Sequence, residues 1–265
     1  MNDIIENTFD DVAEDYDINE YFLITAEKML QDISYKDNLN ILDLSCGTGH
    51  TTLLLAQKFR NSSITAIDIS ASMIEVASKK AKENKFDNIT FKKEDVTKLD
   101  FEKNTFDIIT CGFGLFFYPS MENCFKNFME ILKTDGTFIF SSFSKEAFTP
   151  YGTIFEKTLE KDFNLEYPKG GNNFLETKEE IEELIFSIDS LKYETKKISI
   201  SKNITLNQWW EILNSAGYKG MLNQLSNKDL IKFKEEHLKE ISVHCKEKKI
   251  LLQTNTLITK VQKDI

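Results

Sequence analysis

Short apolar runs alternate with helical patterns between residues 39 and 142 of the chain. The runs are rich in β-branched and aromatic residues and predict strands at Leu39–Leu44, Ser63–Asp68, Ile89–Lys93, Phe106–Thr110 and Thr137–Ser142. Between the runs, apolar residues recur about every 3.6 positions, as they do on one face of a helix. Alternation of strands and helices at this spacing predicts right-handed crossovers and a parallel sheet.

The pattern changes after Ser142. Residues 143–173 are aromatic and irregular, and the next predicted helix has Thr177 and Glu180 placed to cap its start. Alternating residues predict a sixth strand at Tyr193–Lys202, and a last strand is predicted at Ile250–Val261. Helices are predicted between them at 205–216 and 226–241. We therefore expect an α/β fold with a seven-stranded, mostly parallel sheet, helices on both faces and a helical cap inserted around the last strands.

The predicted elements form one domain in two parts. Residues 1–144 would hold N-terminal helices and the ligand-binding core. Residues 145–265 would hold the last two strands and the cap, which is drawn from 145–190 and 203–247.

Composition narrows the functional classes. A net charge of −10, with lysines interleaved among acids, disfavours a nucleic-acid partner, because phosphate neutralisation needs clustered basic residues. The four cysteines are widely separated and show neither CxxC spacing nor an evident metal site. The chain has no apolar run of the roughly 18 residues that a membrane helix needs, and its first residues lack the pattern of a signal peptide. A cytoplasmic protein without membrane insertion is expected.

A small-residue turn follows an acid in the stretch Asn40-Ile41-Leu42-Asp43-Leu44-Ser45-Cys46-Gly47-Thr48-Gly49-His50. Its glycines let the backbone approach a ligand closely, and the helix that starts there presents free N–H groups. A dinucleotide-binding turn would have the spacing G-x-G-x-x-G, which is absent. The acid before the turn would repel a pyrophosphate and attract an ammonium group.

This turn resembles the first motif of the class I S-adenosylmethionine (SAM)-dependent methyltransferases, whose sheet is Rossmann-like. The family usually has glycine at the position of Ser45, and serine is small enough to fit there. The resemblance implies SAM as the cofactor. It places Asp43, Ser45, Gly47 and Gly49 in the cofactor site.

Acids at the ends of neighbouring strands support the same site. Asp68 ends the second predicted strand, where a carboxylate can accept both ribose hydroxyls. The resemblance implies that Asp95 contacts the adenine amino group and that Val96 supplies a backbone N–H. Each acid alone could be a solvated strand-end residue, and we interpret Asp107 as one. Asp43, Asp68 and Asp95 together favour binding.

The resemblance extends on both sides of these acids. It adds to the predicted cofactor site the neighbouring residues Ile69, Met73, Cys111 and Gly112. Residues 9–17 look like the family's N-terminal segment, whose tyrosine closes over the cofactor; this implies Tyr16, which is also our candidate catalytic residue.

Residues 111–144 are similar to the ubiquinone/menaquinone C-methyltransferase branch, as in Gly112-Phe113-Gly114-Leu115. That branch carries polar residues after its Gly-Leu, whereas this chain has Phe116-Phe117-Tyr118, and beyond Ser144 the similarity ends. We expect the methyltransferase fold without the quinone substrate.

Aromatic side chains are the candidates for binding the methyl acceptor: Phe116, Phe117, Tyr118, Tyr151 and Trp209. Trp209 has two interpretations, because it could dock its helix on the core or form a wall around a flat or cationic acceptor. His237 lies in an apolar stripe and is interpreted as a buried helix histidine.

The predicted reaction is methyl transfer to an N, O, S or C atom of a small molecule. A sulfonium is already a strong leaving group, so the protein needs chiefly to hold the reactants close and exclude water. Alternatives are a macromolecular acceptor, such as RNA or an acyl carrier protein, and a SAM-binding module without catalysis. A nicotinamide oxidoreductase is disfavoured by the glycine spacing. A homodimer is possible, and the sequence does not decide this.

Overall fold

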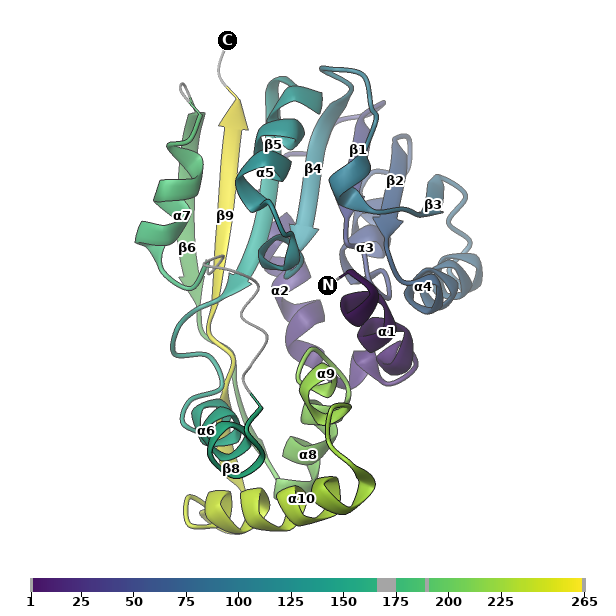
Figure 1. The fold of residues 1–265 in the computed structure, drawn as a ribbon. Coiled ribbons are helices and arrows are strands. Elements are labelled where there is room, and N and C mark those ends of the chain that lie inside the picture. Colours follow the sequence, from purple (N-terminus) through teal and green to yellow (C-terminus); the bar gives the residue numbers. More distant parts are fainter. Residues whose placement is uncertain (1, 166–174, 189–190, 264–265) are drawn as a thin grey trace.

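The computed structural model describes residues 2–165, 175–188 and 191–263. Its main sheet has seven strands in the order β3-β2-β1-β4-β5-β9-β6 (Figure 1). The first five are parallel: β3 (Ile89–Lys93), β2 (Ser63–Asp68), β1 (Asn40–Leu44), β4 (Phe106–Gly112) and β5 (Leu132–Phe143). β9 (Thr256–Lys263) runs antiparallel to β5 and to β6 (Leu191–Ile198). The predicted Rossmann-like, seven-stranded, mostly parallel sheet is confirmed.

The central strand β1 is buried on both faces from Ile41 to Leu44, and its one charged residue there, Asp43, is buried too. Ile41 packs with Leu55 on the face covered by α2 (Glu20–Leu30) and α3 (His50–Lys58). Leu42 and Leu44 pack with Phe125 of α5 (Met121–Ile131) on the opposite face. The helix α4 (Ala71–Glu83) contacts β2 and β3. Helices therefore cover both faces and leave the carboxyl ends of the strands for a site.

A cap lies beyond the carboxyl ends of the strands (Figure 1). It contains the two-stranded sheet of β7 (Ser201–Ile204) and β8 (Ile250–Gln253), with α6 (Tyr151–Phe163), α8 (Leu206–Asn214), α9 (Lys219–Leu222) and α10 (Asn227–Ser242). Phe155, Trp209 and Phe233 are fully buried in its apolar core. Tyr21 and Phe22 of α2 and Phe113 after β4 belong to the same core, which therefore joins the cap to the carboxyl edge of the main sheet.

Two predicted strands are each divided between the two sheets. The prediction at Tyr193–Lys202 covers parts of β6 and β7, and the one at Ile250–Val261 covers β8 and part of β9. At the first break the alternation of Tyr193–Lys202 continues through residues 199–200, so this pattern cannot show that the chain leaves one sheet for the other. At one break, Thr254 donates its N–H to the Ile200 carbonyl.

The segment after β5 also differs from the prediction. Residues 151–163, expected to be irregular, form α6, and residues 166–174 lie outside the described part. The capping box of Thr177 and Glu180 on α7 (Lys178–Ile185) is confirmed. However, α7 does not join the cap, because Ile181, Leu184 and Ile185 pack into the α5 side of the main core.

The N-terminal segment also lies at the carboxyl ends of the strands of the main sheet. It consists of α1 (Asn2–Val12), which contacts α4 and α9, and the short 3-10 turn η1 (Tyr16–Ile18). Asp10 fastens α1 to the start of α4 by accepting hydrogen bonds from the Ser70 hydroxyl and the Ser72 N–H at 2.6 and 3.0 Å. In the described ranges, no helix combines the length and apolar character needed to cross a bilayer.

Candidate active site

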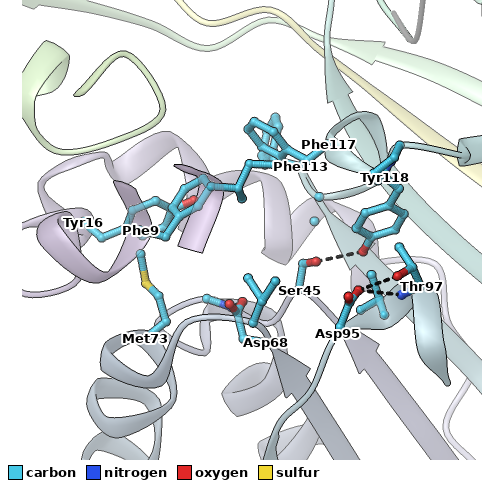
Figure 2. A pocket seen from close by; sticks show the side chains of 17 residues that line it. Phe9, Tyr16, Ser45, Asp68, Met73, Asp95, Thr97, Phe113, Phe117 and Tyr118 are labelled. Carbon is cyan, nitrogen blue, oxygen red and sulfur yellow. Dashed lines mark hydrogen bonds between the residues drawn. The ribbon is translucent and has the colours of Figure 1, made fainter. Parts of the chain in front are cut away.

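A pocket lies at the carboxyl ends of β1 to β4 (Figure 2). The direction of strand order reverses between β1 and β4, and such switch points are where open α/β sheets bind ligands. The lining comes from α1, η1, the strand ends, the start of α4 and the segment after β4. It consists of Ile5, Phe9, Tyr16, Ser45, Gly47, Asp68, Ile69, Met73, Asp95, Val96, Thr97, Gly112, Phe113, Gly114, Phe117, Tyr118 and Pro119.

The turn after β1 needs backbone angles that favour glycine. Gly47 and Gly49 have φ of +54° and +88°. Gly49 caps α3 outside the lining, and an added Cβ would lie 3.1 Å from that of Ala77. Gly47 lines the pocket and donates its N–H to Asp68 Oδ2 at 2.8 Å. The two glycines therefore have different positions, one facing the pocket and one behind it.

Asp43 lies beneath this turn and outside the lining. It is buried, and its two oxygens accept hydrogen bonds from the Thr52 hydroxyl at 2.5 Å and the Thr110 hydroxyl at 2.7 Å. Burial raises the pKa of the Asp43 carboxyl to about 6. Its contact with a cofactor stays a prediction, and the structure gives it the role of tying β1 to α3 and β4.

Asp43→Asn is expected to raise the free energy of unfolding by about 1–2 kcal/mol at pH 7.5. Because the pKa of Asp43 is higher in the folded chain than its ordinary 3.8, ionising it costs stability. That cost is absent at low pH and grows as the pH rises from about 4 through 6. Urea unfolding at pH 4 and pH 7.5 measures it, and an equal difference between variant and wild type at both pH values would contradict the explanation.

Asp68 and Asp95 occupy neighbouring strand ends on the sheet side of the pocket (Figure 2). Asp68 is buried, which raises the pKa of its carboxyl, and it accepts a second backbone hydrogen bond from Ser70 N–H at 2.9 Å. Asp95 caps the 3-10 turn η2 (Val96–Lys98) and accepts from the N–H and hydroxyl of Thr97 at 2.9 and 2.7 Å. Burial would raise the pKa of Asp95, but the hydrogen bonds from Thr97 and Lys98 outweigh it and lower the pKa.

Aromatic side chains form the other side of the pocket. Phe9, Tyr16, Phe113 and Phe117 face the acids across it (Figure 2). The Tyr16 ring stacks on Phe22 with centroids 4.5 Å apart and an angle of 7°. Burial raises the pKa of the Tyr16 hydroxyl, and the charges of Asp68 and Asp17 raise it further. Tyr16 is therefore a neutral phenol at physiological pH, able to donate a hydrogen bond but not to act as a base.

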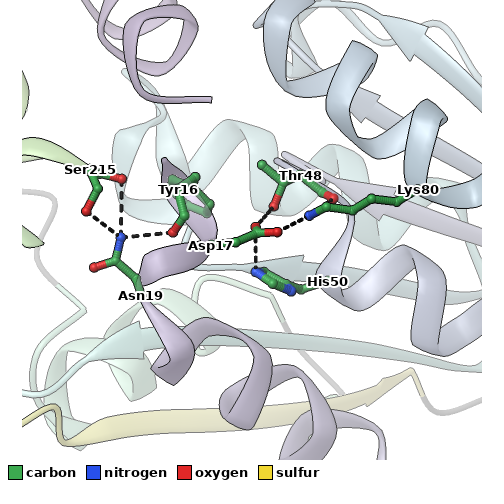
Figure 3. A network of polar contacts seen from close by, with 7 residues as sticks. All are labelled: Tyr16, Asp17, Asn19, Thr48, His50, Lys80 and Ser215. Carbon is green, nitrogen blue, oxygen red and sulfur yellow. Dashed lines mark hydrogen bonds and ion pairs between the residues drawn. The ribbon is translucent and has the colours of Figure 1, made fainter. Parts of the chain in front are cut away.

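A polar network holds Tyr16 in place (Figure 3). Asp17 Oδ1 accepts from the Thr48 hydroxyl at 2.6 Å and pairs with His50 Nε2 at 3.1 Å, while Asp17 Oδ2 pairs with Lys80. Burial opposes ionisation of Asp17, but these hydrogen bonds prevail and lower its pKa. Sequence reasoning missed Asp17, whose only signal was its place beside Tyr16.

The cap holds the other side of the same turn (Figure 3). Asn19 Nδ2 donates to the Tyr16 carbonyl at 2.9 Å and to the carbonyl and hydroxyl of Ser215 at 3.2 and 2.9 Å. Asn19 is buried, so these bonds are shielded from water. Tyr16 is thus fixed between the glycine turn and the cap.

The structure brings most of the predicted cofactor residues together. Those in the lining are Tyr16, Ser45, Gly47, Asp68, Ile69, Met73, Asp95, Val96 and Gly112. Cys111 lies behind it, fully buried, with Sγ 3.4 Å from the Tyr118 hydroxyl. Sequence reasoning missed Ile5, Phe9, Thr97, Phe113, Gly114 and Pro119.

Only some of the residues predicted to bind the methyl acceptor lie in the pocket. Phe117 and Tyr118 line the pocket, whereas Phe116 packs behind Phe117 with centroids 4.7 Å apart. Tyr151 and Trp209 do not reach it and belong to the cap core.

The position of Trp209 favours the first of its two interpretations, in which it docks its helix on the core. It is fully buried, and its indole N–H donates to His237 Nε2 at 2.9 Å. Burial lowers the pKa of His237 to about 4, which keeps the imidazole neutral. The buried-histidine interpretation of His237 is confirmed.

Comparisons with known proteins agree with this geometry. A family model described as a methyltransferase domain matches residues 35–217. The ubiquinone/menaquinone biosynthesis C-methyltransferase UbiE of Rickettsia rickettsii is 34% identical over 196 residues, which cover 70% of this chain and 77% of that protein.

Solved structures share the fold at low sequence identity. The phosphoethanolamine N-methyltransferase 2 of Haemonchus contortus, solved with SAM, has a TM-score of 0.59 at 17% identity over 96% of this chain and 57% of that one. The YcgJ protein of Bacillus subtilis has a TM-score of 0.61 at 17% identity over 93% of this chain and all of that one.

Proposed function

This chain belongs to the SAM-dependent methyltransferase family, and from that premise we propose that it methylates a small molecule whose reacting part is apolar or aromatic. The observation that carries the proposal is the division of the pocket. Carboxylates line the side formed by the strand ends, and aromatic rings line the opposite side. One side suits the cofactor and the other suits the acceptor.

The lining residues fit the cofactor. Asp68 would hold the ribose hydroxyls, because a buried carboxylate makes strong hydrogen bonds there. The side chains of Ile69, Met73 and Val96 would contact the adenine faces, and Asp95 would accept from the adenine amino group. When bound, SAM supplies a methyl group on a positively charged sulfur that leaves as a neutral thioether.

The protein's own part in the reaction is positioning. Phe9, Phe113 and Phe117 would hold the acceptor and exclude water from the reacting atoms, which raises the fraction of productive encounters. Within the pocket lining, Asp68 and Asp95 are held by backbone and side-chain donors, and Tyr16 is a neutral phenol. This set favours an acceptor that is nucleophilic without a strong base, such as an electron-rich carbon, a thiol or an amine.

Two further observations support this acceptor class. The 34% identical relatives are named as C-methyltransferases, which favours carbon as the attacked atom. The net charge of −10 favours a small molecule over RNA. A quinone is not proposed, because the residues after β4 are Phe116-Phe117-Tyr118.

Calorimetric titration with SAM, S-adenosylhomocysteine and NADH tests the cofactor site. Binding of both adenosyl ligands, without NADH, is expected. A panel of phenols, thiols, amines, RNA and an acyl carrier protein, scored by S-adenosylhomocysteine formation, then tests the acceptor. Turnover with a thiol, with an amine or with a phenol that is methylated on a ring carbon supports the proposal. Turnover with a macromolecule alone contradicts its small-molecule part, and binding without any turnover favours the non-catalytic alternative.

Tyr16→Phe is expected to lower kcat about tenfold while changing the Kd for SAM less than twofold. The substitution removes the hydroxyl but keeps the ring that stacks on Phe22. Steady-state kinetics and calorimetry measure the two quantities. Tyr35→Phe is the matched control, since the exposed Tyr35 hydroxyl donates to Asp37 and lies outside the pocket lining. Wild-type turnover by Tyr16→Phe would remove this residue as a catalytic candidate.

A further inference from the structure

Ser45 adopts a backbone conformation that its side chain disfavours. Its φ is +50°, in the left-handed region where a Cβ crowds the backbone. Glycine would occupy the position without this cost. Strained residues are common at ligand sites, where the side chain that causes the strain often has a function.

Gly114 makes room for that side chain. Its φ is −103°, so its own backbone does not require glycine. A Cβ at Gly114 would lie 2.7 Å from Ser45 Cβ and 2.9 Å from Ser45 Oγ. The segment after β4 is therefore shaped around a serine at 45.

The Ser45 hydroxyl spans the crevice between β1 and β4. It shares a hydrogen bond of 2.8 Å with the Tyr118 hydroxyl (Figure 2). Tyr118 follows the 3-10 turn η3 (Leu115–Phe117) after β4, is buried, and has its hydroxyl 3.4 Å from Cys111 Sγ. Burial raises the pKa of Tyr118, so both members of the pair are neutral hydroxyls. Both also line the pocket.

The order of strand ends shows which part of the cofactor the pair would meet. Asp95 and Val96 follow β3, Asp68 ends β2, and Ser45 follows β1. A ligand with adenine over β3 and ribose over β2 must extend its remaining part over β1 and β4. In SAM that part is the methionyl group, which carries the sulfonium.

We propose that Ser45 and Tyr118 act as one unit that positions the methionyl part of SAM at the crevice between β1 and β4. This inference rests on the proposed cofactor site and concerns residues at which the chain departs from its family's motif. The strained serine is retained because glycine could not provide the hydroxyl that meets Tyr118.

The test compares Ser45→Gly, Tyr118→Phe and the double variant in calorimetric titrations. The probes are SAM, S-adenosylhomocysteine and 5′-methylthioadenosine, which shares the adenosine but lacks the aminobutyrate chain. Asn38→Gly is the matched control. Asn38 is exposed before β1, has φ of +58°, and lies outside the pocket lining, so the variant relieves similar strain away from the site.

Each single variant is expected to weaken binding of SAM and S-adenosylhomocysteine about fivefold and to leave 5′-methylthioadenosine unchanged. The double variant should lose no more than a single one, because either change removes the same unit. Asn38→Gly should bind all three probes as the wild type does.

Three results would overturn the inference: unchanged affinities in both single variants, equal weakening of all three probes, or losses that add in the double variant. Equal weakening would mean that the crevice has collapsed. These results are distinct from failure of the proposed cofactor site, in which the wild type would bind none of the probes.

Discussion

Asp68→Ala is expected to weaken SAM binding by about 2–3 kcal/mol, a loss of about 30- to 150-fold in affinity. Asp68 would make charge-assisted hydrogen bonds to the ribose, and these are stronger than bonds between neutral groups. Its carboxylate also receives the N–H groups of Gly47 and Ser70. The variant therefore loses both the ribose contact and the support of the glycine turn.

Calorimetry at fixed pH measures this change, and thermal unfolding without ligand checks that the variant is folded. Asp107→Ala is the matched control. Asp107 accepts a backbone hydrogen bond from Asn40 N–H at 2.8 Å and pairs with Lys133, but it lies near the start of β4, at the other edge of the sheet. Asp107→Ala should leave SAM affinity unchanged. Wild-type affinity in Asp68→Ala would exclude this residue from the cofactor site.

Trp209→Ala is expected to lower the free energy of unfolding by about 3–5 kcal/mol. The substitution leaves a large cavity in the cap core, because the Trp209 side chain is fully buried. It also leaves His237 Nε2 without the indole donor described above. Urea unfolding measures the loss, and kcat per folded molecule, measured below the unfolding transition, should change little.

Trp210→Ala provides the comparison from the next position on α8. Trp210 is only partly buried, and its ring is covered by Lys234, whose Nζ lies 5.2 Å from the centroid. A loss of about 1 kcal/mol is expected. If Trp209→Ala instead kept wild-type stability and lost turnover, the interpretation of this side chain as a wall for the acceptor would replace the docking one.

Local patterns were sufficient to predict the core of the fold. The strands from β1 to β5 contain short runs rich in β-branched and aromatic residues, and each is followed within a few residues by a turn or a helix start. Asp68 and Asp95 could be found because their position depends only on where a strand ends. Parallel strands then bring those ends to one edge without further information from the sequence.

Features that depend on distant contacts could not be predicted in this way. Trp209 and Phe117 have similar aromatic character in sequence, yet one faces His237 in the cap core and the other faces the pocket. Asp17 resembles many other acids on an acidic chain, and its importance comes from Thr48 and Lys80, more than 30 residues away. The division of two strands between sheets has the same cause.

The adjacent positions of Trp209 and Trp210 have a spectroscopic consequence. They are the only tryptophans in the sequence, and both lie on α8 in the cap. Fluorescence excited at the red edge of the tryptophan absorption band therefore reports on the cap alone. Far-ultraviolet circular dichroism, in contrast, reports on the backbone of the whole chain. The natural chain therefore carries its own optical label for the cap. Stopped-flow fluorescence can time rearrangements of the cap without a dye or an engineered fluorophore.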